Sequence, residues 1–296
     1  MAADLGSDRS PGLRAGHHDN MPSPTPEVLT SSSNPRVAAG VALRDRRERE
    51  RTGLTLVDGA REVRRALDAG VEVVEAFTCE PLLAGPDARA ALDRLLAGSA
   101  PLHGTSERVF AKLAFGERAE GIVAIVRIPS LELGRLSLPV DPLVLVLEGL
   151  EKPGNIGAVL RTADGAGVDA VVAASPRTDL FNPNAIRASA GTVFAVPTAS
   201  ASTADVLAWL RGSGVRILAT RVDAERRYSD VDLTGPVALV LGAEDEGLTN
   251  AWNAPDIESI RLPMSGIADS LNVSVTAAVV AYEARRQRGD PQRPGR

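Results

Sequence analysis

Three polar segments, each following an apolar run, carry the residue types best suited to chemistry. In the first, residues 148–163, Gly149 and Gly154 have the spacing of a phosphate-binding loop. Asn and Ile nevertheless stand where that loop needs Lys and Ser/Thr to hold phosphate and Mg²⁺, and no dinucleotide-binding G-x-G-x-x-G is present. The segment predicts a helix with Asn155 as its N-cap and Arg161 less than two turns further on. An ordinary capped helix with an arginine in solvent explains the same residues equally well.

The second segment, residues 237–248, is an apolar strand that ends at Gly242 and continues into an acidic turn. Ligands of parallel α/β sheets bind at the carboxyl ends of the strands, and a glycine there lets the backbone approach a ligand closely. Glu244 or Glu246 could then bind a hydroxyl or an amine of that ligand. The simpler alternative is a turn that happens to be acidic.

The third segment, residues 260–288, runs from a strand through a Pro/Gly loop into a long helix. Ser270, Asn272 and Ser274 place polar groups where this helix should begin. Capping of the helix by Ser270 is the simplest explanation, but it leaves Asn272 without a reason.

The composition excludes several kinds of catalyst. The 296 residues include one cysteine, Cys79, and one histidine outside the N-terminal tail, His103, so a disulfide, a multi-His metal site or a His-based triad is not expected. No metal is predicted. Aromatic residues make up only 3%, which disfavours recognition through many base-stacking platforms. Two of the 33 basic residues, Lys112 and Lys152, are lysine, so 31 are arginine.

The net charge is −5, so a nucleic-acid partner would have to meet a local basic patch rather than a polycation. The segment from Arg36 to Arg51 predicts a helix with five arginines from Arg44 onward. A solvated helix face is the simpler interpretation, and a contact with RNA phosphates through Arg44 and Arg47 is the alternative. No apolar run is long enough to span a membrane and no secretory signal is visible, so a cytoplasmic location is expected.

Length and patterning predict two α/β domains. The predicted strands are 54–57, 71–78, 122–128, 143–147, 169–173, 215–219, 237–241 and 258–262. The predicted helices are 36–51, 59–69, 87–97, 106–115, 155–167, 183–190, 203–212 and 270–288. The alternation in the second half favours a parallel sheet with helices on both faces. The predicted divisions are a disordered tail (1–33), a first domain (34–128), a linker (129–141), a second domain (142–288) and a disordered tail (289–296).

The order and wording of the three segments together are far more specific than any one alone. Asn-x-Gly-x-x-x-Arg-Thr-Ala, then Leu-Gly-x-Glu, then Leu-Pro-Met followed by Ser-Leu-Asn-Val-Ser-Val resembles the motifs of the TrmH-type RNA ribose 2′-O-methyltransferases of the SPOUT superfamily. The resemblance implies a C-terminal parallel-sheet domain tied in a trefoil knot, a rare exception to ordinary chain connections. It also implies an L30e-like RNA-binding domain before it, S-adenosylmethionine as methyl donor, and a homodimer with the active site at the subunit interface.

The resemblance also implies roles for particular residues. Those expected to be catalytic are Arg161, Asn155, Glu244, Ser270 and Asn272. Those expected to hold the cofactor are Leu241, Gly242, Leu262, Met264 and Leu271. Those expected to contact RNA are Arg44, Arg47 and Arg187, the last reaching the partner's site. Asp245 and Glu246 make the second motif more acidic than in many relatives, and the role of Glu246 stays open.

The implied chemistry suits a chain with few catalytic side chains, because a sulfonium methyl is already a strong electrophile. The protein must align a ribose 2′-hydroxyl with it and assist loss of the proton. Arg161 can do this as a base or by stabilising the developing alkoxide, and the second is favoured because arginine is a poor base.

Ribosomal RNA of the large subunit is the expected substrate, and tRNA is the alternative. A member that confers antibiotic resistance by modifying that RNA stays possible. A catalytically silent RNA-binding protein of the same fold and a Rossmann-like small-molecule enzyme are the rival hypotheses, which the motif residues and the missing glycine fingerprint disfavour.

Overall fold

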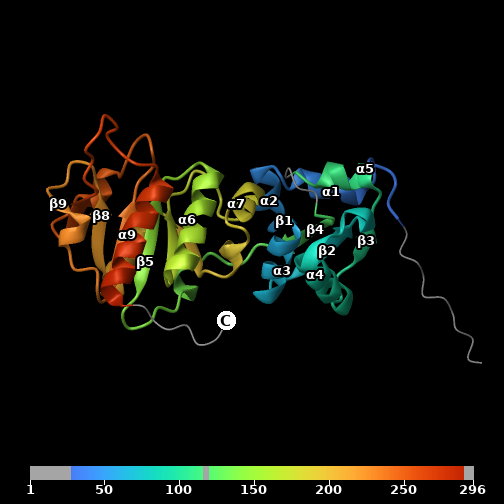
Figure 1. Ribbon diagram of the computed structural model, residues 1–296, viewed down its shortest axis with the longest axis horizontal. Helices are drawn as coiled ribbons and strands as arrows, with labels where there is room; N and C mark the ends of the chain where they lie inside the picture. Colours follow the sequence, from blue (N-terminus) through green and yellow to red (C-terminus); the bar gives the residue numbers. More distant parts are fainter. Residues whose placement is uncertain (1–27, 116–119, 290–296) are drawn as a thin grey trace, which may run out of the picture.

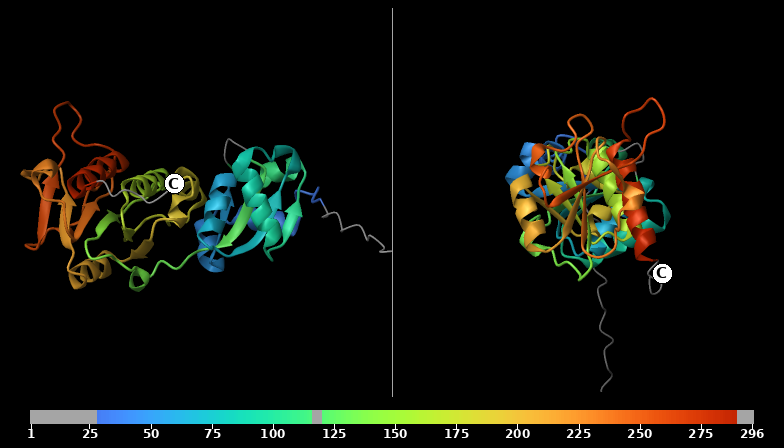
Figure 2. Two further views of the ribbon diagram at one scale, coloured as in Figure 1. Left: turned by 60° about the horizontal axis from the view of Figure 1, so that its bottom comes forward. Right: turned by 90° about the vertical axis from the view of Figure 1, so that its left-hand side faces the viewer.

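Two α/β domains lie end to end in the computed structural model, which describes residues 28–115 and 120–289 (Figure 1). A view from a second direction shows the same arrangement (Figure 2). Residues 1–27 of the tail predicted at 1–33, and residues 290–296 of the tail predicted at 289–296, lie outside the described residues. None of the helices in the described part of the chain combines the length and apolar character that a membrane span needs.

The N-terminal domain is built on a four-stranded sheet in the order β1-β4-β2-β3. Its strands are β1 (Leu54–Asp58), β2 (Val73–Thr78), β3 (Leu102–Gly104) and β4 (Ile122–Arg127). Its helices are α1 (Pro35–Ala42), α2 (Arg46–Thr52), α3 (Ala60–Asp68), α4 (Gly85–Ala97) and α5 (Glu107–Leu113). β4 pairs antiparallel with both β1 and β2, whereas β3 pairs parallel with β2. The sequence did not predict β3, because three residues between Pro101 and Thr105 give no alternating pattern.

The single helix predicted for residues 36–51 is wrong, because the chain forms two helices there. α1 ends at Ala42, and Asp45 begins α2 by accepting a hydrogen bond from the backbone N–H of Arg47. An N-cap side chain of this kind satisfies one of the N–H groups that a helix start leaves without a partner. The break turns α2 toward the C-terminal domain.

The prediction of a disordered tail is also wrong for residues 28–33. Leu29 donates its N–H to the carbonyl of Gly104 at 2.8 Å and accepts from the N–H of Ser106 at 3.1 Å. Arg108 and Lys112 of α5 donate to the carbonyls of Thr30 and Ser32. The edge strand β3 supplies unpaired backbone groups, so a polar segment without periodicity is still held in place.

The C-terminal domain holds a parallel sheet of seven strands in the order β7-β6-β5-β10-β8-β11-β9. Its strands are β5 (Leu143–Glu148), β6 (Ala170–Ala174), β7 (Thr198–Ala201), β8 (Arg216–Thr220), β9 (Arg226–Arg227), β10 (Val237–Leu241) and β11 (Ile257–Arg261). Its helices are α6 (Pro153–Ala166), α7 (Pro183–Ala188), α8 (Thr203–Gly212) and α9 (Val273–Arg288). The edge strands β7 and β9 were not predicted, because they are short and polar.

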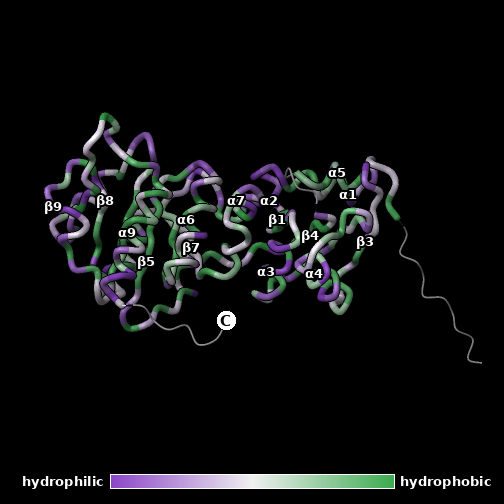
Figure 3. The backbone as a smooth tube through the Cα atoms, in the orientation of Figure 1, coloured by the Kyte–Doolittle hydropathy of each residue, from purple (hydrophilic) through white to green (hydrophobic). Residues whose placement is uncertain are grey.

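Both faces of this sheet are buried, which explains the continuous apolar run of β5. Leu143, Leu145 and Leu147 pack on the side of α6 and α9, whereas Val144 and Val146 pack on the side of α8. Strands buried on both faces lose the polar alternation of a half-exposed strand. The prediction of a parallel sheet with helices on both faces is confirmed, and Figure 3 shows β5 and β8 running largely through apolar residues.

The two domains share one continuous core. Val57 and Val63 of the N-terminal domain belong to the same buried cluster as Phe181 and Ile186 beside and within α7. α7 lies against β1, and the Thr55 hydroxyl donates to the carbonyl of Phe181 at 2.7 Å. This joint therefore fixes where the N-terminal domain stands relative to the carboxyl edge of the parallel sheet.

Candidate active site

The three polar segments meet at one edge of the parallel sheet. They follow β5, β10 and β11, and the carboxyl ends of parallel strands lie at the same edge. The loop between β11 and α9 is drawn in red at the top left of Figure 1, beside the turn that follows β10. Segments that are separated by about a hundred residues in the sequence thus form one site.

A pocket of about 470 Å³ opens at this edge. Its lining includes every residue that the sequence assigns to the cofactor: Leu241, Gly242, Leu262, Met264 and Leu271. Glu244 and Ser270 line it as well. A volume of this size is typical of small-molecule sites, which combine apolar walls with a few polar groups.

Gly242 is required by the close approach of the backbone at the pocket wall. A Cβ at this position would lie 2.3 Å from the carbonyl carbon of Gly247, so any larger residue would push the turn 243–247 away. The turn is closed by a hydrogen bond from the N–H of Gly247 to the carbonyl of Ala243 at 2.9 Å. A backbone-lined wall beside the apolar side chains of Leu262 and Leu271 fits an adenine and ribose, so the residues present fit S-adenosylmethionine.

Glu244 is the centre of a hydrogen-bond network next to the pocket. Its carboxylate forms an ion pair with Lys152 and accepts a hydrogen bond from Asn155 Nδ2 at 2.8 Å. Asn272 Nδ2 donates to the same carboxylate oxygen and lies 3.3 Å from Asn155 Oδ1. The two asparagines and the glutamate come from α6, from the loop before α9 and from the turn after β10, so the network ties all three segments together.

The ion pair with Lys152 lowers the pKa of Glu244 below its ordinary value, and the hydrogen bond from Asn155 adds to this. The same contact raises the pKa of Lys152. Hydrogen bonds and opposite charge favour the ionised forms of both groups. Glu244 is therefore a carboxylate at neutral pH, and it can only accept hydrogen bonds from a bound ligand.

The prediction of Asn155 as a helix N-cap is wrong, and so is capping by Ser270, the simpler explanation of the third segment. α6 begins with Lys152 as its N-cap and Pro153 in the first turn, so Asn155 lies inside the helix and its side chain is free to bind Glu244. α9 is capped by Asn272, not Ser270. Asn272 Oδ1 accepts from the N–H and hydroxyl of Ser274 at 2.9 and 2.6 Å, which points its amide nitrogen at Glu244.

Arg161 lies six residues after Asn155 on α6, and six residues turn the helix to a position about 120° away from Asn155. Its side chain is exposed. Among residues 28–115 and 120–289, it has no hydrogen-bond or ion-pair partner. The structure therefore does not join Arg161 to the Glu244 network within one chain.

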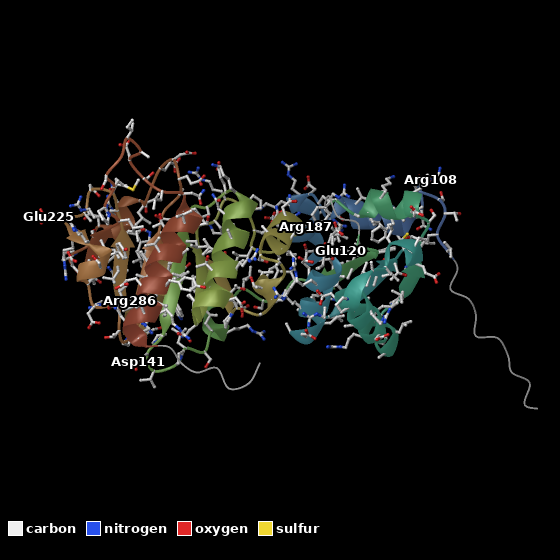
Figure 4. The ribbon with its side chains drawn as sticks, in the orientation of Figure 1. Arg108, Glu120, Asp141, Arg187, Glu225 and Arg286 are labelled. Carbon is white, nitrogen blue, oxygen red and sulfur yellow. The ribbon has the colours of Figure 1, made fainter. Side chains whose placement is uncertain are left out.

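The three arginines expected to contact RNA lie in different surroundings. The Arg44 guanidinium binds the carbonyls of Lys112, Leu113 and Ala114 at 2.9–3.1 Å, so it satisfies the C-terminal end of α5. Arg187 pairs with Asp58 Oδ2 at 3.2 Å where α7 meets the N-terminal domain (Figure 4). Arg47 is exposed on α2, and no other described residue binds its guanidinium.

Sequence reasoning missed Lys152 and Arg177. Lys152 is one of two lysines in the chain and lies inside the first motif, so its type and place could have singled it out. Arg177 pairs with Glu246, which is 69 residues further along, and no sequence pattern indicates that contact. Within the described residues, no three His, Cys, Asp or Glu side chains are grouped as metal ligands.

Comparison with known proteins agrees with this geometry. Residues 142–282 match the SpoU rRNA Methylase family and residues 34–124 match the MRM3-like substrate binding domain. A 23S rRNA (guanosine-2′-O-)-methyltransferase RlmB of Burkholderia sp is 33% identical over 79% of this chain and 97% of its own. A 23S rRNA (uridine(2479)-2′-O)-methyltransferase of Streptomyces viridochromogenes is 32% identical over 60% of this chain and 64% of its own.

The AdoMet-bound rRNA methyltransferase from Sinorhizobium meliloti has a similar structure, with a TM-score of 0.80 and 28% identity over 88% of this chain and 97% of that one. Fold and site together define the class of S-adenosylmethionine-dependent RNA ribose 2′-O-methyltransferases. The chain belongs to the SpoU rRNA methylase family. The predictions of this activity and of this cofactor are confirmed at the level of the family.

Proposed function

We propose that this protein methylates a ribose 2′-hydroxyl of large-subunit ribosomal RNA. One observation carries the proposal: Asn155 and Asn272 bind Glu244, which lines the pocket that fits the cofactor. The names of the relatives support 23S rRNA as the substrate. A substrate-binding domain covers residues 34–124, ahead of the methylase domain.

Some residues of the chain bind the cofactor, and others stabilise the charge that develops during the reaction. When bound, S-adenosylmethionine supplies a methyl group on a positively charged sulfur, which is a strong electrophile. Gly242, Leu262 and Leu271 hold the cofactor, and Glu244 accepts hydrogen bonds from the ligand or the ribose. Arg161 stabilises the alkoxide that develops at the 2′-oxygen, because a guanidinium is a very weak base that donates hydrogen bonds far more readily than it accepts a proton.

The face formed by α6 and α9 supports a homodimer. Val275 and Tyr282 of α9 are 46% and 52% exposed, although both are large and apolar. Arg161 lies one turn before Gly165 on α6, and a Cβ at Gly165 would be only 2.8 Å from the Tyr282 hydroxyl oxygen. Arg161 therefore stands beside an uncovered apolar face. A second copy bound there would bury the face and complete an active site at the interface, as the family resemblance implies.

The trefoil knot and the cytoplasmic location also belong to the proposal. The segment 262–272 lines the same pocket as residues 220–223 and the turn 243–247 before α9 returns to α6. This close approach of three chain segments is compatible with the knotted connection that the family resemblance implies. The proposed divisions are an RNA-binding domain at 34–128, a linker at 129–141 and a methylase domain at 142–288.

The decisive experiment maps 2′-O-methylation across total RNA from cells with and without the protein. We expect one ribose methylation in 23S rRNA to be lost when the protein is absent and restored by the wild-type chain but not by Arg161→Ala. A lost site in tRNA would replace the proposed substrate. Loss of no site in any RNA would contradict the enzyme and favour a silent RNA-binding protein.

A further inference from the structure

Glu246 is the last of the three carboxylates in the turn 243–247, and it does not join the Glu244 network. It forms an ion pair with Arg177, whose other guanidinium nitrogen lies 3.5 Å from Glu151. Arg177 stands in the loop 175–179 after β6, and its N–H donates to the carbonyl of Leu150 at 3.0 Å. The turn is therefore held at two points, by Lys152 on Glu244 and by Arg177 on Glu246.

The loop 175–179 is also bound to helix α2 of the N-terminal domain. Arg46 donates to the carbonyl oxygen of Arg177 at 2.6 Å. Two residues along, Asp179 accepts hydrogen bonds from Arg49 at 2.6 and 3.3 Å. One short loop thus contacts the substrate-binding domain through the Arg177 carbonyl and the Asp179 side chain, and the cofactor turn through the Arg177 side chain.

The turn needs such support because of its charge. Glu244, Asp245 and Glu246 are three consecutive acidic residues, and like charges this close repel each other. Lys152 and Arg177 each neutralise one of them, which lowers the pKa of both glutamates. Without Arg177, the backbone wall beside Gly242 would keep its contacts through Glu244 and lose the ion pair of Glu246.

We propose that Arg177 is a positioning residue that holds the turn 243–247 in its cofactor-binding form and connects it to α2. The placement of the substrate-binding domain then affects how tightly the cofactor is bound, although α2 contributes no residue to the pocket. Since linkage is reciprocal, cofactor binding also favours that placement. This inference rests on the proposed function, because it takes S-adenosylmethionine as the ligand of the pocket.

The test measures S-adenosylmethionine binding to the full chain by calorimetry, with no RNA present. We expect Arg177→Ala to weaken binding about two- to fivefold, as loss of one exposed ion pair allows. Arg46→Ala should also weaken binding, and the double variant should be no weaker than Arg177→Ala alone. Arg51→Ala is the matched control, because Arg51 lies on the same helix but pairs with Glu48 and not with the loop. It should bind like the wild type.

Steady-state kinetics separate positioning from catalysis. Arg177→Ala should raise the KM for S-adenosylmethionine and leave kcat nearly unchanged, and Arg177→Lys should recover much of the loss. Wild-type binding by Arg177→Ala would overturn the positioning role, and additive effects of the two substitutions would overturn the connection to α2. A wild-type chain that binds no S-adenosylmethionine would contradict the proposed function itself, with the positioning role falling alongside it.

Discussion

Two surfaces of the methylase domain differ in whether a single chain supplies partners for the side chains that lie there. At the joint with the N-terminal domain, arginines meet carbonyls and carboxylates: Arg49 is 2% exposed and binds the carbonyls of Leu43 and Arg44 together with Asp179. On the α6–α9 face, apolar side chains are exposed and Arg161 has no partner among the described residues. Burying a polar group without a hydrogen-bond partner costs free energy. At the first surface, the same chain supplies every partner named for the buried Arg49.

The difference shows where arginine is structural and where it is available for chemistry. Arg44, Arg49 and Arg187 fall in or near the segments that suggested RNA contact, but the folded chain uses all three to hold its own parts together. Of the arginines predicted to act in catalysis or RNA binding, Arg47 and Arg161 are the two whose guanidinium groups have no partner among the described residues. Four predictions test this contrast.

The largest effect is expected at Arg161. Arg161→Ala should lower kcat for RNA methylation about 100- to 1,000-fold, the loss seen when one donor to a developing oxyanion is removed. Because Arg161 does not line the pocket, S-adenosylmethionine binding measured by calorimetry should stay the same. Arg161→Lys tests the guanidinium: activity close to wild type near neutral pH would argue against an obligatory role for it.

The second-largest effect is expected at the exposed apolar face of α6 and α9. Tyr282→Arg should weaken dimerisation about thirtyfold, since a buried aromatic at an interface contributes roughly 2 kcal/mol or more, and methylation should fall with the dimer. Sedimentation over a concentration series measures this. Leu96→Arg changes an exposed apolar residue on α4 of the N-terminal domain and serves as the control. A wild-type chain that sediments as a monomer at every concentration would disprove the dimer.

A substitution at the domain joint should lower the stability of the fold and leave dimerisation unchanged. Arg49→Ala leaves Asp179 and two carbonyls without their donor, so we expect the free energy of unfolding to fall by about 2–3 kcal/mol. Urea denaturation gives the value, and Arg51→Ala on the same helix should change it little. Sedimentation should show the same dimer as the wild type. An Arg49→Ala chain as stable as the wild type would mean that the joint does not depend on this arginine.

The smallest effect concerns pH. The folded pKa of Glu244 is lowered from its usual 4.5, so the contribution of its ion pair is complete above that pH and is lost as the pH falls through the lower folded value. Cofactor binding should therefore hold from neutral pH down to 4.5 and weaken only below it. Lys152→Ala removes the largest cause of the shift and should move this weakening to higher pH. Identical pH profiles for the two proteins would show that Lys152 does not set the protonation of Glu244.

Much of the fold could be predicted because local patterns are strong. The run Leu143–Leu147 is apolar throughout because both of its faces are buried. Gly242 follows a strand, and the backbone of Gly247 packs too closely against it for a side chain. The ends of helices were harder to predict from the sequence. Asn155 and Ser270 are good N-cap types, but Lys152 and Asn272 are the N-caps, since a side chain's partner depends on the whole site.

The sequence by itself determined the class of this protein, because three motifs hold side-chain types at fixed spacings along the chain. The family resemblance also assigned five residues to the cofactor, and all five line one pocket of the folded chain. Only the tertiary structure decided what each charged residue binds. Arg49 with Asp179, Arg187 with Asp58 and Arg177 with Glu246 pair across 69 to 130 residues. Ion pairing depends on distance in space, and no local pattern records which charges folding will bring together.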